Sequence, residues 1–487
     1  MQDGTPNWTP GPAPVVSNIW AELAGNGFNA RLSDSLSLDR TVPDHRHPQC
    51  LKIKYDLASL PKASIVIVFH NEWLSPLLRS IHSVLNRTPP EILHEIILID
   101  DGSTHDWLKE KLQQHVDLLP KTRLVRLPQR SGLVIARLKG IEEATGEVFV
   151  VLDSHIECQE GWLEPLVYRI GQDRKVMVMP QIDSINQETF EQNAGGIGCT
   201  LGFLWTLVEH GIYVQAKDRK VMKDETDYTP SPAMAGGLFA GNREYFWEIG
   251  GYDRQFGFWG TENLELSFRL WQCGGRLECT ICSRVYHIFR QGGHSYSMPG
   301  DHLAKNKLRT TLLWMDEYGD FVRRALHDPK VNIGSLTEMR DLRKRLQCKS
   351  FDWFLKNVYP ENMITDLKDF VGLGKLVTKT GKPCVDSYGG SHTWLLMRVR
   401  NSDEEMEIRP MDNLENCLTH SGTLVNCDWH PSEGLWTLDK RTGMIRERNT
   451  AKCLTAQQGK ITTEACVDTN DNQRWTYDEY HPKAPEE

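Results

Sequence analysis

Short apolar runs alternate with amphipathic stretches along the chain from Ala63 onward. The apolar runs are rich in Val, Ile and Leu and predict buried strands, at 65–69, 95–99, 124–126 and 148–152. The stretches between them carry apolar residues at helical spacing and predict helices, at 74–85, 107–116 and 134–144. Strands and helices in alternation are typical of βαβ units, so the pattern predicts an α/β fold with a parallel sheet.

The pattern changes after Pro360, where shorter strands, turn residues and cysteines follow one another. Trp394, Trp436 and Trp475 recur at nearly constant spacing, and in two repeats an Ile-Arg pair precedes a Cys-Leu pair. Three repeats of ~40 residues predict a three-fold all-β unit. Small β units with thin cores often need short disulfide loops, and two cysteine pairs have that spacing: Cys417 with Cys427 and Cys453 with Cys466.

Length and charge narrow the class of protein. At 487 residues the chain is too long for one compact core, and a typical size of ~150 residues per domain predicts two to three domains. Acidic residues outnumber basic residues by 65 to 56, the net charge is -9, and no Lys/Arg-rich run stands out. Nucleic acid is therefore not an expected partner.

The sequence predicts a protein of an oxidising compartment with no membrane anchor of its own. Its longest mostly apolar stretch, 197–208, is interrupted by Gly and Thr and is shorter than the ~20 residues of a membrane span. Residues 1–14 lack the apolar stretch of a secretory signal. Twelve cysteines, five of them between Cys384 and Cys466, are typical of a disulfide-bonded chain. Cys279 and Cys282 have the spacing of zinc ligands, but without a second pair we expect no zinc site.

Polar and charged side chains follow two of the predicted strands, namely Asp100 and Asp101 after the second and Asp153, Ser154 and His155 after the fourth. In open parallel sheets, ligands bind at the carboxyl ends of the strands. Asp153 and His155 are two residues apart and point to the same side, so they can share one cation. A carboxylate with an imidazole suits a borderline ion such as Mn²⁺ better than Ca²⁺. The glycine motifs of dinucleotide sites and P-loops are missing, so those functions lose support.

The segment 259–275 predicts a helix with acidic residues at its start. Its apolar residues form a buried face, made of Leu264, Phe268 and Trp271. We expect Glu262 to point outward at the helix start, where it is available for chemistry. For Glu265 we expect the structural role of a carboxylate that stabilises the helix dipole.

Two residues further along the chain complete the candidate chemistry. His287 is a third possible metal ligand, and Arg290 is a cation able to neutralise a leaving phosphate. A metal bound by these side chains keeps open positions for diphosphate oxygens. The residues therefore indicate metal-assisted chemistry on a diphosphate.

The order of motifs resembles that of the polypeptide N-acetylgalactosaminyltransferases, which start mucin-type O-glycosylation of Ser and Thr. The matching segments extend over nearly the whole chain, at 27–34, 69–72, 95–101, 153–155, 234–239, 259–275 and 351–360. The resemblance implies an α/β nucleotide-sugar fold of the GT-A type, followed by an all-β ricin-like β-trefoil. The implied parts are an N-terminal luminal segment, a GT-A catalytic domain, a linker and a lectin-like trefoil, at 1–49, 50–345, 346–375 and 376–487.

The resemblance also implies roles for single residues. Asp153, His155 and His287 would hold Mn²⁺, and Glu262, Trp259 and Arg290 would be catalytic. The residues implied to bind the donor, UDP-N-acetylgalactosamine, are Asp101, Arg130, Ser154, Gly236, Trp259, Arg290 and Tyr296. The family retains the anomeric configuration by front-face attack of the acceptor hydroxyl, and a covalent intermediate on Glu262 is the alternative.

For the cysteines, the resemblance implies two bridges, Cys50 with Cys282 and Cys273 with Cys348. It leaves four cysteines without an assignment, namely Cys158, Cys199, Cys279 and Cys384. It implies Golgi-luminal residence as a single-pass type II membrane protein whose anchor is not in this sequence, and peptide or glycopeptide acceptors carrying Ser or Thr.

The chain departs from the family at sites that bear on activity. Thr261 stands where the family has the second glycine of Trp-Gly-Gly-Glu-Asn, and Ile197 and Cys199 stand where Phe and Trp contact the peptide acceptor. Thr419 and Thr455 replace the sugar-binding Asp of two trefoil repeats, so we expect a structural or docking trefoil rather than a lectin. Two alternatives stay open: a weak or inactive homologue that binds UDP or glycopeptide, and a transferase for another UDP-sugar.

Overall fold

The computed structural model describes residues 26–477, apart from 197, 291–299, 365, 385–392, 400–401, 403, 412 and 428–433. The described chain divides into two compact units. The first contains the residues before Leu204 together with Leu207–Trp314 and Val331–Glu361. The second contains Leu204–Thr206, Met315–Lys330 and the residues from Asn362 onward.

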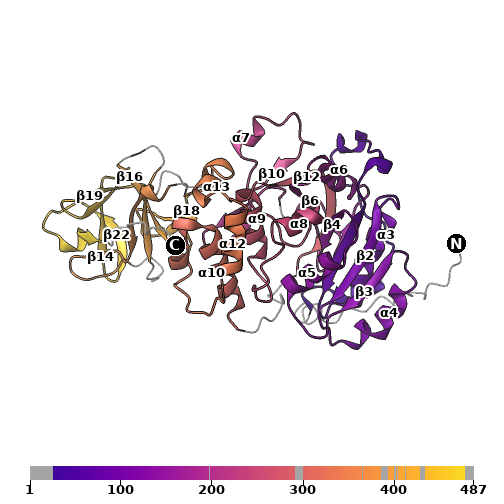
Figure 1. Cartoon of the computed structure of the whole chain (residues 1–487). Coiled ribbons are helices and arrows are strands. Elements are labelled where there is room, and N and C mark those ends of the chain that lie inside the picture. Colours follow the sequence, from indigo (N-terminus) through magenta and orange to yellow (C-terminus); the bar gives the residue numbers. More distant parts are fainter. Residues whose placement is uncertain are drawn as a thin grey trace. The chain divides into compact units, whose positions relative to one another are not determined.

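A mixed sheet forms the centre of the first unit (Figure 1). Among the described residues its strand order is β10-β12-β6-β11-β4-β1-β2-β3. The bounds are β1 (Ala63–Phe69), β2 (Leu93–Asp100), β3 (Thr122–Arg126), β4 (Val148–Leu152), β6 (Val176–Ile185), β10 (Thr229–Pro230), β11 (Phe239–Asn242) and β12 (Arg276–Ile288). Because β1 pairs in parallel with β2 and β4, and β2 with β3, the four predicted strands and their parallel pairing are confirmed.

The three predicted helices connect these parallel strands, as α3 (Leu74–Asn86), α4 (Glu110–Val116) and α5 (Leu133–Glu143). The start of the second one differs, because residues 106–108 form a separate 3-10 turn before α4. Helix α5 contacts β1 and β2. A glycine makes this close packing possible, since a Cβ at Gly140 would lie 2.2 Å from Cγ1 of Val66.

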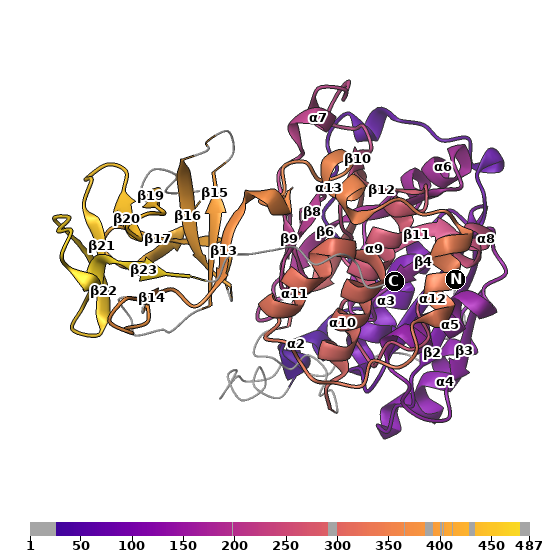
Figure 2. The same ribbon diagram turned by 60° about the vertical axis from the view of Figure 1, so that its left-hand side comes forward.

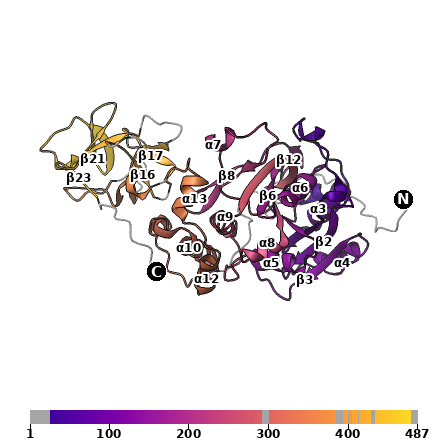
Figure 3. The ribbon, with the colours of Figure 1, turned by 45° about the horizontal axis from the view of Figure 1, so that its top comes forward.

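Further helices surround the sheet, among them α2 (Ala30–Ser35), α6 (Glu164–Gln172), α8 (Arg243–Glu248), α9 (Glu262–Gln272), α10 (His302–Trp314), α12 (Thr337–Arg345) and α13 (Phe351–Asn357). In the part of the chain that the structure describes, no helix is both long enough and apolar enough to cross a bilayer. Helices α9 and α10 contact each other and lie side by side (Figure 3).

Helix α9 is buried on all sides. The predicted face, formed by Leu264, Phe268 and Trp271, is buried, but the opposite side is buried as well. There Glu265 accepts two hydrogen bonds from the guanidinium of Arg269, one turn later. Glu265 therefore has a buried ionic partner in addition to its place in the first turn.

Five disulfides join ten of the cysteines. All four expected pairs are confirmed, namely Cys50–Cys282, Cys273–Cys348, Cys417–Cys427 and Cys453–Cys466. The fifth, Cys199–Cys279, joins two cysteines that the sequence left unassigned. Because Cys279 and Cys282 are bonded to different partners, their sulfurs are not available as zinc ligands.

The second unit consists mainly of short antiparallel strands (Figure 2). Its described strands form one sheet in the order β13-β15-β16-β19-β20-β21-β22 and the pairs β14-β23 and β17-β18. The bounds are β13 (Phe370–Gly374), β14 (Val377–Thr378), β15 (Trp394–Arg398), β16 (Glu405–Pro410), β17 (Asn416–Leu418), β18 (Leu424–Asn426), β19 (Trp436–Asp439), β20 (Met444–Glu447), β21 (Cys453–Gln457), β22 (Lys460–Glu464) and β23 (Trp475–Thr476).

The three recurring tryptophans, Trp394, Trp436 and Trp475, are buried in the core of this unit. Each indole N–H donates a hydrogen bond to a backbone carbonyl at or next to a cysteine of the same repeat. The acceptors are Cys384 at 3.3 Å, Leu418 at 2.9 Å and Leu454 at 2.8 Å. The three sequence repeats therefore share one local contact.

Cys158, in β5 (Ile156–Cys158) of the first unit, provides a test of the packing around that strand. Its thiol is fully buried, and burial raises its pKa to about 12. Because the thiolate is the reactive form, we expect iodoacetamide to leave Cys158 unmodified in the native protein at mildly alkaline pH and to alkylate it after denaturation in guanidinium. Peptide mass spectrometry measures both states, and alkylation of the native protein would contradict the described packing of β5.

Candidate active site

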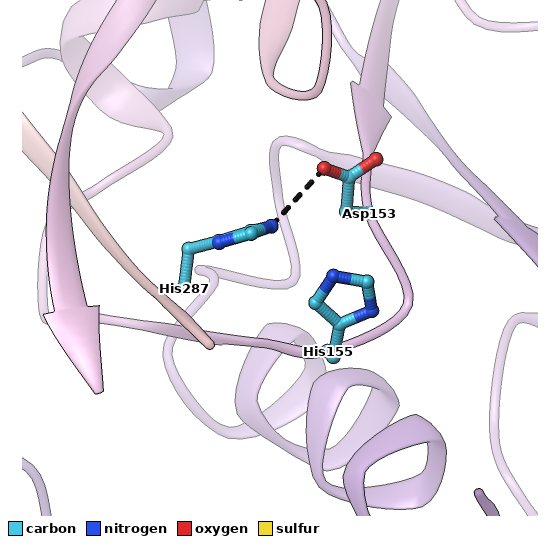
Figure 4. Close-up of side chains that lie close together, drawn as sticks. All are labelled: Asp153, His155 and His287. Atoms are coloured by element: carbon cyan, nitrogen blue, oxygen red, sulfur yellow. Dashed lines mark ion pairs between the residues drawn. The ribbon is translucent and has the colours of Figure 1, made fainter. Parts of the chain in front are cut away.

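Three side chains that the sequence predicts as metal ligands meet at the carboxyl end of β4 and beside β12 (Figure 4). Asp153 directly follows β4 and His155 directly precedes β5. Strand β5 pairs with β12 so that His287 lies opposite Ile156. The ligating atoms of Asp153, His155 and His287 all lie within 4.8 Å of one another, and Nε2 of His287 is 3.3 Å from Oδ2 of Asp153. Side chains far apart in the sequence thus form one cluster.

A buried carboxylate, Glu72, organises this cluster from behind. Its side chain is only 3% exposed. Oε2 of Glu72 accepts a hydrogen bond from Oγ of Ser154 and lies 2.9 Å from Nδ1 of His155, while Oε1 forms an ion pair with Arg290. Glu72 therefore orients His155, a candidate metal ligand. It also orients Ser154 and Arg290, which the resemblance implies bind the sugar donor.

The charges in the cluster are balanced, and their side chains are buried or partly buried. Burial disfavours the ionised form of Glu72, but Arg290 and His155 outweigh it and hold its pKa at about 2. Burial is likewise outweighed at Asp153, where His287 and Arg137 hold the pKa well below its usual range. Burial lowers the pKa of His287. At neutral pH both carboxylates are therefore charged and His287 is neutral, which are the states that metal binding requires.

The ligating atoms of the cluster fit a divalent metal ion. A carboxylate only accepts hydrogen bonds, so Nδ1 of His155 carries a proton toward Glu72, and Nε2 is the ring atom left to bind a metal. Metal-binding histidines are typically held in this way by a carboxylate behind the ring. Nδ1 of His287 is buried and has no hydrogen-bond partner among the described residues. One carboxylate and two imidazoles form a mixed set that suits a borderline ion such as Mn²⁺ and leaves coordination positions open.

A pocket opens at the carboxyl ends of β1 and β2, close in sequence to Glu72. Its empty space, part of it open to solvent, measures about 380 Å³ and is lined by Val68, Phe69, His70, Asp101, Arg130, Gly132, Leu133, Phe258 and Trp259. His70 lines the pocket, and Glu72, two residues later, contacts His155 of the candidate metal-ligand cluster. The chain segment after β1 therefore joins the two parts of the candidate active site.

Asp101 shapes the wall of the pocket that carries Arg130. Its two carboxylate oxygens accept hydrogen bonds from the backbone N–H groups of Ser131 at 2.6 Å and Gly132 at 2.8 Å. Gly132 has a φ of 91°, and a Cβ there would lie 2.4 Å from Cα of Phe258, so the position needs glycine. The guanidinium of Arg130 lies over the ring of Phe258, 5.3 Å from its centroid. Three predicted donor residues, Asp101, Arg130 and Trp259, thus line one pocket.

Glu262 does not point outward, contrary to our expectation. Its side chain is buried, with Oε1 accepting a hydrogen bond from Arg137 at 3.1 Å and Oε2 accepting one from the backbone N–H of Gly260 at 2.8 Å. The guanidinium of Arg137 also lies 3.5 Å from Oδ1 of Asp153, so it serves two carboxylates. Burial raises the pKa of Glu262, and Arg137 opposes this effect. The expectation was wrong because α9 is buried all round, so a carboxylate in its first turn needs a cation instead of solvent.

Thr261 has a backbone conformation that favours glycine. Its φ is 70° and its ψ is -7°, a left-handed geometry that is strained for a β-branched residue. The side chain is buried, and Oγ1 has no hydrogen-bond partner among the described residues. The loop before α9 therefore has, at Thr261, a backbone conformation that glycine would adopt without strain.

The other residues predicted for the donor and acceptor sites are only partly covered by the described residues. Gly236 packs against the start of α9, where a Cβ would lie 3.1 Å from Cβ of Asn263. Cys199, expected near the acceptor, is bonded to Cys279. Tyr296 and Ile197 lie outside the described residues.

Sequence reasoning missed two residues of the site, Glu72 and Arg137. Both are charged side chains next to apolar segments, Glu72 after β1 and Arg137 within the buried face of α5. A charge buried among apolar residues requires a partner of opposite charge or a metal. That requirement is the sequence signal that could have identified them.

Comparisons with known proteins agree with this geometry. Residues 64–250 match the family model of glycosyl transferase family 2, and residues 220–291 match that of the N-terminal domain of galactosyltransferase. The chain is similar to the "Probable N-acetylgalactosaminyltransferase 9" of Caenorhabditis elegans, with 41% identity over 459 residues, 93% of this chain and 75% of that protein. It is similar to polypeptide N-acetylgalactosaminyltransferase 6 of Bos taurus, with 38% identity over 482 residues, 92% of this chain and 77% of that protein. The crystal structure of GalNAc-T7 with UDP, GalNAc and Mn²⁺ matches with a TM-score of 0.75 at 32% identity, covering 99% of this chain and 94% of that chain.

The role of Glu72 can be tested by the substitution Glu72→Gln, which keeps the shape of the side chain and removes its charge. We expect the affinity for Mn²⁺ to fall roughly 10- to 100-fold, because His155 and Arg290 lose the carboxylate that orients them. Titration calorimetry measures this affinity. Glu278→Gln is the matched control. Glu278 is equally buried, lies on another part of β12, and forms ion pairs with Arg169 and Arg276. Equal Mn²⁺ affinities of the two variants would contradict the role of Glu72.

Strain at Thr261 predicts the unusual result that glycine stabilises the protein. We expect Thr261→Gly to raise the free energy of unfolding by up to about 1 kcal/mol, because glycine adopts a positive φ without steric conflict. Thr200→Gly is the matched control, since Thr200 is also buried with a hydroxyl that lacks a partner among the described residues, but its φ is not positive. We expect this control to lower the stability. Denaturant unfolding measures both, and a loss of stability in Thr261→Gly would count against the strain.

Proposed function

The chain belongs to the polypeptide N-acetylgalactosaminyltransferases, a family of glycosyltransferases, and we propose that it transfers N-acetylgalactosamine from UDP-N-acetylgalactosamine to Ser and Thr hydroxyls of polypeptides. Its first unit has a glycosyltransferase fold of the GT-A type. The observation that carries the proposal is the cluster of Asp153, His155 and His287 beside a pocket lined by Asp101 and Arg130. A metal-ligand set next to a pocket with a cationic wall suits a nucleoside diphosphate sugar.

In this proposal the pocket binds the donor, with the uridine near Asp101 and Arg130 and the sugar near Gly236 and Trp259. Ser154 and Tyr296 complete the donor site. Asp153, His155 and His287 would hold Mn²⁺, which would supply positive charge against the diphosphate. Arg290, oriented by Glu72, would bind the diphosphate through its guanidinium group.

The transfer retains the anomeric configuration. The acceptor hydroxyl oxygen forms a bond to C1 of the sugar on the face from which UDP departs, and the bond between C1 and the β-phosphate oxygen breaks. The hydroxyl proton passes to the departing β-phosphate, so the products are UDP and the glycosylated peptide. Front-face attack is favoured over a covalent intermediate because both oxygens of Glu262 are engaged, by Arg137 and by Gly260.

We propose that the second unit is a ricin-like β-trefoil with a structural or docking role. The three equivalent tryptophan contacts support the trefoil. Thr419 and Thr455, at the positions of the sugar-binding Asp, are buried. The hydroxyl of Thr419 bonds with Ser421 and Thr423, and that of Thr455 accepts a hydrogen bond from Gln473. Asp386, which keeps the acid of the first repeat, lies outside the described residues.

The proposed partners are the donor UDP-N-acetylgalactosamine and peptides or glycopeptides with Ser or Thr. The proposed location is the Golgi lumen, where the family works as single-pass type II membrane proteins. The five disulfides support an oxidising compartment of this kind.

The proposed function predicts that UDP release from UDP-N-acetylgalactosamine with Mn²⁺ depends on a peptide. A pooled Ser/Thr peptide library, with and without sugar already attached, supplies the acceptors, and a coupled assay for UDP measures the release. We expect peptide-dependent release that disappears in Asp153→Ala, because the substitution removes the carboxylate ligand. Donor binding without any peptide-dependent release would reject the transferase and favour a UDP- or glycopeptide-binding homologue. Release with another UDP-sugar alone would reassign the donor.

A further inference from the structure

The loop that supplies Phe258 and Trp259 to the pocket lies on helix α10. The side chain of Asn306, in that helix, is fully buried. Its Nδ2 donates hydrogen bonds to the carbonyls of Gly257 at 3.0 Å, Trp259 at 3.1 Å and Gly260 at 3.0 Å. Its Oδ1 accepts one from the backbone N–H of Gly257 at 2.8 Å. One amide thus binds the loop backbone at four points.

The two glycines of the loop allow this close approach to α10. A Cβ at Gly257 would lie 2.0 Å from Nδ1 of His302, and a Cβ at Gly260 would lie 2.6 Å from Cδ1 of Leu303. The ring of Phe258 also packs edge-on against His302, with the centroids 4.8 Å apart. The first turns of α10 therefore form a surface that fits the loop backbone.

This loop is connected to both parts of the candidate active site. On the pocket side, the carbonyl of Phe258 accepts the backbone N–H of Leu133 at 2.7 Å, and the ring of Phe258 lies under Arg130. On the other side, the strained Thr261 leads into α9 and Glu262. A strained conformation persists only where surrounding contacts hold it. The contacts of Asn306 end at Gly260, the residue next to the strain.

We propose that Asn306 is a positioning residue for the donor: by binding the backbone of residues 257–260 it holds Phe258 and Trp259 in the pocket. Asn306 itself does not line the pocket, so it acts only through the loop. The inference deepens the proposed function and rests on it, because the pocket is taken as the donor site.

The test compares Asn306→Ala and Asn306→Asp with the native protein. Asn306→Asp keeps the shape of the side chain and the oxygen that accepts the N–H of Gly257. It loses the Nδ2 group that donates to three carbonyls. Calorimetric titration with UDP-N-acetylgalactosamine in Mn²⁺ should show a Kd raised roughly 10- to 100-fold in both variants, since small misplacements of binding groups have effects of this size. With an active peptide, the loss should fall on the KM for the donor more than on kcat.

The matched control is Asn242→Ala. Asn242 is also a buried asparagine, but it caps helix α8 by accepting the backbone N–H of Tyr245 at 3.0 Å and does not line the pocket. We expect this variant to lose thermal stability and to keep the native Kd. If Asn306→Asp keeps the native Kd, or if Asn242→Ala loses affinity to the same extent, the positioning role is rejected.

Hydrogen exchange supplies a second readout that does not depend on the donor. Peptides that cover 257–260 should exchange faster in Asn306→Asp, while peptides of α8 keep their native rates. Unchanged exchange in 257–260 would reject the inference, and so would an Asn306→Asp chain that unfolds throughout instead of loosening this loop. A native protein that binds no UDP-N-acetylgalactosamine rejects the proposed function instead, and the exchange comparison then still decides whether Asn306 holds the loop.

Discussion

Buried charge at the carboxyl edge of the central sheet is the constraint on which the candidate active site depends. Glu72, Asp153 and Glu262 are acidic groups in or beside this region, and the guanidinium groups of Arg290 and Arg137 compensate them. Removal of one member of such a set leaves an uncompensated charge in a region of low dielectric constant, which is strongly destabilising. The same pairing fixes the side chains that would contact metal and diphosphate. Stability and catalytic geometry are thus set by one network, and Arg137 and Glu72 are its two links.

The sequence was sufficient for those features that depend on local pattern. Alternating apolar runs predicted strands β1 to β4 and the helices between them, and spacing alone predicted the disulfides of the second unit. Asp153 and His155 were predictable because a strand end places residues two apart on the same side. His287, by contrast, reaches them only through the pairing of β12 with β5, which no local pattern reveals.

Features that depend on tertiary burial escaped prediction. The outward orientation expected for Glu262 was wrong, because the first turn of α9 is covered and its carboxylate is satisfied by Arg137, 125 residues earlier in the chain. Cys199 and Cys279 stayed unassigned, because pairing over 80 residues requires knowledge of which loop lies beside which strand. In the second unit the repeat of tryptophans was readable, but the inward hydrogen bonds of Thr419 and Thr455 follow only from packing.

Thr261 shows that the surrounding fold can hold a β-branched residue in a backbone conformation that favours glycine. The left-handed conformation of Thr261 is disfavoured by sterics on the order of 1 kcal/mol, yet the loop has many backbone contacts on either side. Oε2 of Glu262 binds the N–H of Gly260, Leu133 binds the carbonyl of Phe258, and α10 supports the loop from behind. Because these contacts together outweigh the strain, the surrounding fold holds Thr261 in the left-handed conformation.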